Sequence, residues 1–130
     1  MKRPWVMTSS DSSPGHPRAY GTFAQKYAQY VAKEHVISMA QFIRSSSALT
    51  ADTLGLAQRG HLRPGYYADV VVFDPARYAA KATYTQPTLL SEGVVAVLVN
   101  GRLAVDGGQP TGIGAGVPLL RAPKAGSCGA

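Results

Sequence analysis

Residues 59–74, which read RGHLRPGYYADVVVFD, decide the fold of this 130-residue chain. Pro64-Gly65 is a turn dipeptide, and it leads into the apolar run Val70–Phe73. Val and Phe favour the pleated, packed surface of a strand, and four residues are too few for a helix. Asp69 precedes the run and Asp74-Pro75 follows it, where proline cannot continue a ladder of backbone hydrogen bonds. The stretch therefore predicts one buried strand that is entered and left by turns.

A β-hairpin is predicted farther along, in residues 94–105, which read VVAVLVNGRLAV. Two apolar runs flank Asn100-Gly101, and both of these residues tolerate the positive φ that a type I′ turn requires. We expect antiparallel strands at 94–100 and 102–105. Both faces of this hairpin are apolar, so we expect both to need cover from other parts of a protein.

Helical patterns occupy the first half of the chain. Between residues 21 and 34, apolar side chains recur at i, i+4, i+7 and i+8 and form one stripe, with Lys26 on the polar side. The stripe consists of Phe23, Tyr27, Tyr30 and Val31. This spacing is typical of a helix that packs on a core.

Capping residues predict a second helix and a last short turn. Ser38, with Gln41 three residues later, forms a capping box that opens the second helix. Thr50 is expected to cap the short turn, and Gly55 suits the left-handed position that ends it.

Composition excludes several classes of partner. Thirteen lysines and arginines against seven acidic residues give a net charge of +6, but the basic residues are scattered along the chain. A nucleic-acid surface clusters them, so we expect no nucleic-acid partner. No apolar run approaches the ~18 residues of a membrane span, so we expect no membrane partner. Cys128 is the single cysteine, which excludes an internal disulfide, and the first residues lack the apolar core of a secretory signal. The expected location is the cytoplasm.

Asp11 is the first candidate for a catalytic residue. Residues 4–9 can form a strand, and a Ser-rich loop that ends at Pro14-Gly15 follows it. Asp11 would then lie just beyond the carboxyl end of a strand, which is where β/α barrels place catalytic groups. Without other information, an Asx turn or a helix cap is the favoured role for an aspartate in such a loop.

The sequence motifs around Asp11 resemble those of the N-acyl-D-amino-acid deacylases, or D-aminoacylases, a branch of the metal-dependent amidohydrolases. These motifs are S-D at residues 10–11 and H-P-R-x-Y-G-T-F at residues 16–23. The resemblance implies that Asp11 acts on a metal-bound water as general base and then as acid, and that Arg18 and Tyr20 belong to a loop over the site. We infer from chemistry that Arg18 could pair with the substrate carboxylate. A surface arginine without that role remains an open alternative.

Further words extend this resemblance along the chain. Residues 59–74 are similar to the family phrase G-x-L-x-x-G-x-x-A-D, which returns the chain from the catalytic barrel to a small β-sandwich. Residues 40–56, 81–87 and 111–121 resemble later family motifs. Two departures are Ser46 and Thr50, where the family usually has Thr and Pro, so the chain is expected to be a divergent copy.

The fold implied is an α/β fragment. Residues 1–57 would be the last strand and helices of a TIM-like amidohydrolase barrel, residues 58–121 the C-terminal strands of a small β-sandwich, and residues 122–130 a disordered tail. One strand and two or three helices cannot close an eight-stranded barrel. The missing N-terminal barrel portion is therefore an expected partner, and the apolar segment 5–7 and the aromatic stripe should be partly exposed.

The implied cofactor is Zn²⁺, but no metal ligand is assigned in this chain. A hydrolytic metal site needs several imidazole, carboxylate or thiolate ligands, and His16, His35 and His61 stand isolated. In the family the ligands lie on earlier strands. We therefore expect the chain alone to be inactive on the implied substrate, an N-acyl-D-amino acid.

Two alternatives remain open. One is a fragment of another cyclic-amide amidohydrolase, such as a dihydropyrimidinase or dihydroorotase relative, against which the H-P-R-x-Y-G-T-F words argue. The other is a non-catalytic β-rich binding or oligomerisation module, which the hairpin and the lack of a metal set favour.

Overall fold

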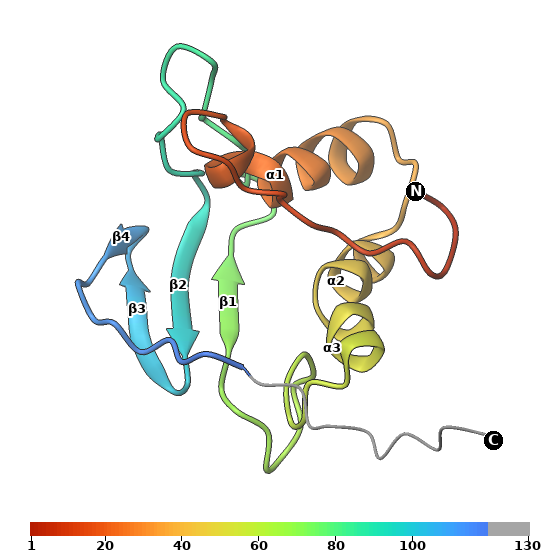
Figure 1. Cartoon of the computed structure of the whole chain (residues 1–130). Helices are drawn as coiled ribbons and strands as arrows, with labels where there is room; N and C mark the ends of the chain where they lie inside the picture. The colour runs from red at the N-terminus through yellow and green to blue at the C-terminus, as the bar shows by residue number, and fades with distance from the viewer. Residues whose placement is uncertain (120–130) are drawn as a thin grey trace, which may run out of the picture.

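The computed structural model describes residues 1–119, in which a helical half precedes a small sheet (Figure 1). The helical half contains α1 (Arg18–Tyr27), a π-helix η1 (Ala28–Lys33), α2 (Met39–Ser46) and α3 (Ala48–Leu54). The sheet contains β1 (Val70–Phe73), β2 (Val94–Val99), β3 (Arg102–Asp106) and β4 (Gln109–Pro110). The predicted tail and the last family motif residues, Leu120 and Arg121, lie outside the described residues.

The sheet is antiparallel, with strands in the order β1-β2-β3-β4. The predicted hairpin is confirmed, because Val99 pairs with Arg102 across Asn100-Gly101. The φ angles of Asn100 and Gly101 are 49° and 77°, as a type I′ turn requires. The hairpin therefore fixes the register of the sheet.

The predicted strand at Val70–Phe73 is also confirmed, but its burial is not. Val71 and Val72 are 56% and 45% exposed. β1 is an edge strand, paired on one side by β2 only, so the described residues leave its other side uncovered. The prediction of a fully buried strand was wrong because the layers that would cover it are not among these residues.

A charged network centred on the nearly buried side chain of Arg59 joins residues 59–69 to the hairpin turn. The guanidinium of Arg59 pairs with the carboxylate of Asp69, donates to Asn100 Oδ1 at 2.7 Å and stacks on the ring of Tyr67, 4.1 Å from its centroid. Asp69 in turn accepts a hydrogen bond from the backbone N–H of Asn100 at 2.8 Å. The aspartate that precedes β1 therefore holds the β2–β3 turn in place.

The predicted helices are present with changed boundaries. The expected helix at residues 21–34 begins earlier, at Arg18, and its last six residues form the π-helix η1. Lys26 was placed on the polar side, which was wrong, because it is only 7% exposed. The π-helix begins directly after Tyr27, so the hydrogen-bonding register of the helix changes next to the two buried residues Lys26 and Tyr27.

Capping of the later helices is confirmed in part. Ser38 caps α2, since its Oγ accepts from the N–H of Gln41 at 3.1 Å. The amide of Gln41 donates to the carbonyl of Lys2 at 3.2 Å, so the printed contacts show only one half of a capping box. Thr50 lies inside α3 and caps nothing, whereas Gly55 ends α3 with φ of 68°, as predicted.

A cluster of aromatic rings connects the helices to the sheet. Tyr27, Ile37 and Phe42 form its buried centre, and Phe73 and Tyr78 pack against it. The ring centroids of Tyr27 lie 5.5 Å from Phe42 and 5.9 Å from Phe73. Because this cluster is the main hydrophobic core of the described residues, it fixes how the two halves sit together.

Exposure of the apolar stripe was predicted correctly only in part. Trp5 is 67% exposed, and Met7 and Phe23 are also exposed. Tyr27 is buried in the aromatic cluster, so the expectation that it would be uncovered was wrong. The sheet half, through Phe73, supplies the cover that the helical half alone lacks.

The strand predicted at residues 4–9 is not formed. This segment is irregular, and the N–H of Thr8 donates to the carbonyl of Ser45 at 2.8 Å. A strand needs a neighbouring strand to satisfy its backbone, and here the segment lies against α2 instead. Within residues 1–119, every helix is too short or too polar to pass through a lipid bilayer.

Candidate functional site

Asp11 lies in an irregular loop before α1, with its carboxylate largely in solvent. Its side chain is 83% exposed, and its φ of 44° is in the left-handed region. It does not cap a helix: α1 begins after Pro17 and has no side-chain cap. The carboxylate is therefore available to an external group, apart from one ion pair.

That ion pair is with Arg18. The Nη1 of Arg18 lies 3.1 Å from Asp11 Oδ2, and its Nη2 donates to Ser13 Oγ at 3.2 Å. The arginine side chain is 37% exposed, and its Nε is buried without a hydrogen-bond partner in the described residues. The structure thus brings together the two charged residues that the sequence singled out, although it forms no strand before Asp11.

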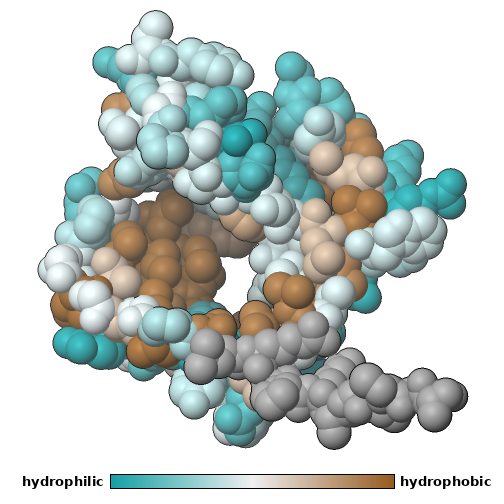
Figure 2. Space-filling model, viewed as in Figure 1, coloured by the Kyte–Doolittle hydropathy of each residue, from teal (hydrophilic) through white to brown (hydrophobic). Residues whose placement is uncertain are grey.

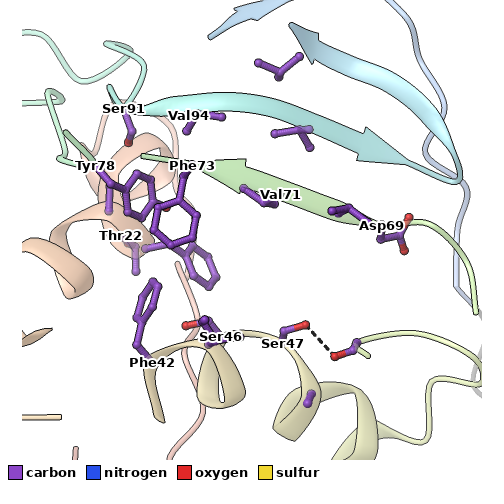
Figure 3. A pocket seen from close by; sticks show the side chains of 18 of the residues that line it. Thr22, Phe42, Ser46, Ser47, Asp69, Val71, Phe73, Tyr78, Ser91 and Val94 are labelled. Atoms are coloured by element: carbon purple, nitrogen blue, oxygen red, sulfur yellow. Dashed lines mark hydrogen bonds between the residues drawn. The ribbon is translucent and has the colours of Figure 1, made fainter. Parts of the chain in front are cut away.

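Tyr20 is separated from this pair and lines a different space. A hollow of about 1040 Å³, called here the central hollow, lies between the helices and the sheet (Figure 3). Its walls come from α1, α2, β1 and β2, and include Tyr20, Phe23, Ile43, Val71, Val94 and Val97. Asp11 and Arg18 are not among its lining residues.

A segment far along the chain reaches the Asp11 loop. The hydroxyl of Tyr84 lies 3.4 Å from His16 Nε2, and the two rings meet edge to face with centroids 5.2 Å apart. The Nδ1 of His16 accepts from the backbone N–H of Arg18 at 3.1 Å. Tyr84 therefore supports the residue that orients Arg18. Tyr84 was not singled out as a site residue, although it lies within residues 81–87, which resemble a family motif.

Lys26 is a second residue whose environment the sequence did not reveal. Its ammonium group donates to Ser45 Oγ at 2.7 Å and to Thr8 Oγ1, and it lies 5.8 Å from the centroid of the Phe42 ring. Desolvation by burial lowers the pKa of Lys26 below its ordinary value. Its hydrogen bonds hold the N-terminal segment on α2, so it positions the segment that leads to Asp11.

Comparison with known proteins gives the class of this chain. Residues 1–105 match the model of the Amidohydrolase family, and the chain belongs to that family.

Three curated relatives, all from Alcaligenes xylosoxydans xylosoxydans, are each 40% identical to it. They are an N-acyl-D-aspartate deacylase over 108 residues, an N-acyl-D-glutamate deacylase over 99 residues and a D-aminoacylase over 100 residues. The matches cover 80%, 73% and 74% of this chain but only 22%, 20% and 21% of the relatives. The chain thus spans about a fifth of the length of these relatives.

Solved structures agree with the sequence matches. A D-aminoacylase structure, said to define a novel subset of amidohydrolases, has a TM-score of 0.84 at 39% identity. It covers 88% of this chain and 25% of that chain. The N-acyl-D-glutamate deacylase of Bordetella bronchiseptica has a TM-score of 0.83 at 40% identity, covering 92% and 26%. The fold of the described residues, a few helices and a small antiparallel sheet, is therefore amidohydrolase-like.

Residues 1–119 do not provide a set of ligands for the metal that these relatives bind. The Bordetella bronchiseptica enzyme is complexed with zinc and a phosphonate inhibitor, and D-aminoacylase has a binuclear metal center. Within residues 1–119, no three His, Cys, Asp or Glu side chains gather where they could hold a metal ion. Both ring nitrogens of His16 already face other groups, Arg18 N–H and Tyr84. These residues by themselves do not fit a zinc site.

Proposed function

We propose that this chain is the C-terminal part of an N-acyl-D-amino-acid deacylase, a hydrolase that cleaves the amide bond between an acyl group and a D-amino acid. The observation that carries this proposal is the 40% identity shared with three deacylases. Their names give three different substrate ranges at the same identity, so the match supports the reaction class without choosing the side chain of the amino acid. We expect this hydrolase in the cytoplasm.

In the proposed reaction, Asp11 moves the proton. Water adds to the acyl carbonyl carbon, the carbon–nitrogen bond breaks, and the products are a carboxylate and a free D-amino acid. The Asp11 carboxylate accepts a proton from the attacking water and delivers it to the departing amine. Its exposure and its freedom from helix capping support this role.

Arg18 binds the substrate carboxylate in this proposal. Its guanidinium already holds one carboxylate, that of Asp11, at 3.1 Å. A substrate carboxylate that takes over the Nη1 hydrogen bond would release Asp11 for proton transfer, so binding and activation would be coupled. Tyr20, on the hollow side of α1, is proposed to contact the substrate only when the rest of the enzyme is present.

The parts of the chain have separate places in this enzyme. We assign residues 1–57 to the end of the catalytic barrel and residues 58–121 to a β-sandwich. The free edge of β1 and the exposed Trp5 support this assignment, because in residues 1–119 the edge has no pairing strand and the Trp5 side chain is largely in solvent. The residues that hold zinc would be supplied by the portion of the enzyme that this chain does not span.

A chimera tests the proposal. This chain would replace the matching region of the Alcaligenes D-aminoacylase, and release of free amine from N-acetyl-D-amino acids would be measured. We expect turnover, and we expect Asp11→Asn to lower it by about 10²–10⁴-fold because the proton shuttle is lost. Asp106→Asn, on the exposed end of β3, is the matched control and should leave turnover unchanged. A folded chimera whose turnover does not depend on Asp11 would refute the assigned role.

A further inference from the structure

A segment between β1 and β2, called here the 79–92 loop, is held on the start of α1 (Figure 1). Its two ends pair through a bridge between Ala79 and Glu92, in which each N–H donates to the other's carbonyl, at 3.3 and 3.0 Å. The hydroxyl of Ser91 donates to the carbonyl of Tyr20 in α1 at 2.9 Å. Figure 2 shows the surface where this loop meets α1 as mostly white and teal, in contrast to the brown interior of the hollow. Polar contacts therefore contribute to holding the loop in place.

Close packing at Gly21 seats the loop on the first turn of α1. A Cβ atom on this buried glycine would lie 3.1 Å from the Cβ of Ala80 and 3.8 Å from that of Ala82. Gly21 is helical, so it serves here to allow a close approach and not to adopt an unusual conformation. The position of the loop and the position of the helix start are thus linked.

A closed turn within the loop contains Tyr84. The N–H of Thr83 donates to the carbonyl of Gln86 at 3.1 Å, and the N–H of Gln86 donates to Thr83 Oγ1 at 3.0 Å. This reciprocal pair of hydrogen bonds restricts the backbone on both sides of Tyr84. The tyrosine is 78% exposed, so its ring contributes little to a hydrophobic core.

Tyr84 reaches the first residue of α1 through His16. Its hydroxyl lies 3.4 Å from His16 Nε2, and the Nδ1 of the same ring accepts from the N–H of Arg18 at 3.1 Å. The N–H groups of the first turn have no acceptor inside a helix, so this acceptor fixes where α1 begins. Because Nδ1 uses its lone pair on this bond, the ring proton lies on Nε2, facing the Tyr84 oxygen.

The side chain of Arg18 has little freedom to correct a shift of its backbone. Its guanidinium is held by Asp11 at 3.1 Å and by Ser13 at 3.2 Å, and its Nε is buried. A movement of the Arg18 backbone would therefore move the guanidinium with it.

We propose that Tyr84 is a positioning residue for Arg18: acting through His16, it fixes the place at which the guanidinium meets the carboxylate of the substrate. The 79–92 loop belongs to the part of the chain that we assign to the β-sandwich, so this part takes a share in substrate recognition. The inference rests on the proposed function for the identity of the ligand of Arg18.

Amide exchange in this chain alone tests the contact without substrate. The rate at which the Arg18 N–H exchanges with water is measured by NMR. Tyr84→Ala should raise this rate by at least about threefold, because the acceptor loses its support, and Tyr84→Phe, which removes only the hydroxyl, by a smaller factor. Tyr66→Ala is the matched control and should leave the rate unchanged. Tyr66 also meets a histidine edge to face, with its centroid 6.0 Å from that of His61, but His61 pairs with Asp52 in α3.

Selectivity of the chimera tests the effect on the substrate. The two substrates are an N-acetyl-D-amino acid and its carboxamide, which lacks the charge that Arg18 binds. Tyr84→Ala should raise KM for the carboxylate about three- to tenfold, the effect of one hydrogen bond, and change kcat by less than about twofold. Both constants for the carboxamide should change by less than about twofold, whereas a general loss of folding would impair both substrates alike.

A conservative variant supplies the rescue. His16→Asn keeps an oxygen that can accept the Arg18 N–H through an Asx turn, so its KM for the carboxylate should stay near that of the unmodified chimera. His16→Leu has no acceptor and should reproduce the effect of Tyr84→Ala.

Three results would overturn the inference: an Arg18 exchange rate that Tyr84→Ala leaves unchanged, the same change in Tyr66→Ala, or an equal rise in KM for both substrates. An inactive chimera of the unmodified chain would refute the proposed function, and with it the role of Tyr84 toward substrate. An active chimera together with any of the three results would refute this inference alone.

Discussion

At the scale of single residues, Arg59 and Asp69 explain how two segments that are distant in the sequence are joined, residues 59–69 and the β2–β3 turn. The two side chains are ten residues apart in the sequence and form an ion pair. Arg59 donates to the side chain of Asn100, and Asp69 accepts from its backbone N–H. The Arg59 side chain is nearly buried, so removing it leaves a carboxylate without its partner. We predict that Arg59→Ala lowers the free energy of unfolding by about 1–3 kcal/mol, measured by urea denaturation.

The matched control is Arg102→Ala, which removes an exposed arginine at the start of β3. It should change the free energy of unfolding by less than about 0.5 kcal/mol. Equal effects of the two substitutions would show that the Arg59 network does not hold the turn.

Lys26 predicts how stability depends on pH. Its folded-state pKa is lowered by desolvation, whereas the unfolded value is the ordinary 10.5. Between the two values the unfolded state binds more protons, so the free energy of unfolding rises as pH increases through that window. Lys26→Met should remove this part of the rise, and Lys33→Met should not.

The measurement is urea denaturation at several pH values below 10. Burial raises the pKa of Tyr78, which gives the opposite slope above 10, where its phenol ionises first in the unfolded state. The difference between the two lysine variants therefore isolates Lys26. A parallel pH profile for both would contradict the assignment.

The candidate site was only partly predictable from residues. The loop motif placed Asp11 and Arg18 near each other, and the structure pairs them at 3.1 Å. The contact of His16 with Tyr84 joins positions 68 residues apart, and no local pattern encodes such a distance. Burial of Lys26 also escaped prediction, because helical periodicity assigns a lysine to solvent and cannot foresee the hydroxyls of Thr8 and Ser45.

At the scale of elements, local chemistry determined the turns and caps well. The Asn100-Gly101 turn, the Ser38 cap and the Gly55 helix end depend on backbone conformations that few residue types adopt, so the sequence predicts them directly. The strand expected at residues 4–9 failed for the opposite reason. A strand depends on a neighbouring strand, and in the described residues this segment hydrogen-bonds to α2 instead.

Gly101 provides the test at this scale. Its φ is 77°, which β-branched residues resist. We predict that Gly101→Val lowers the free energy of unfolding by about 1 kcal/mol or more. Gly114→Val is the control, because that glycine has no positive φ and no atom near an added side chain. The measurement is thermal unfolding of the two variants. Equal stability of Gly101→Val and Gly114→Val would contradict the turn assignment.

At the scale of the whole molecule, residues 1–119 pack around one aromatic cluster but leave large apolar surfaces open. The central hollow, the edge of β1 and Trp5 all lack cover from residues 1–119. The family matches explain these surfaces, since the chain corresponds to about a fifth of its relatives. The sequence motifs could predict that part of the barrel is missing, but the shape of the hollow could be seen only in the structure.

We propose that this chain contributes Asp11 to an active site that other residues complete. The most direct test measures release of free amine from an N-acetyl-D-amino acid, with Zn²⁺ present, by the purified chain and by the chimera. We expect no release by the chain above the metal-only background, and release by the chimera from the D-substrate in preference to its L-isomer. Turnover by the purified chain alone, abolished by a chelator and by Asp11→Asn, would contradict it.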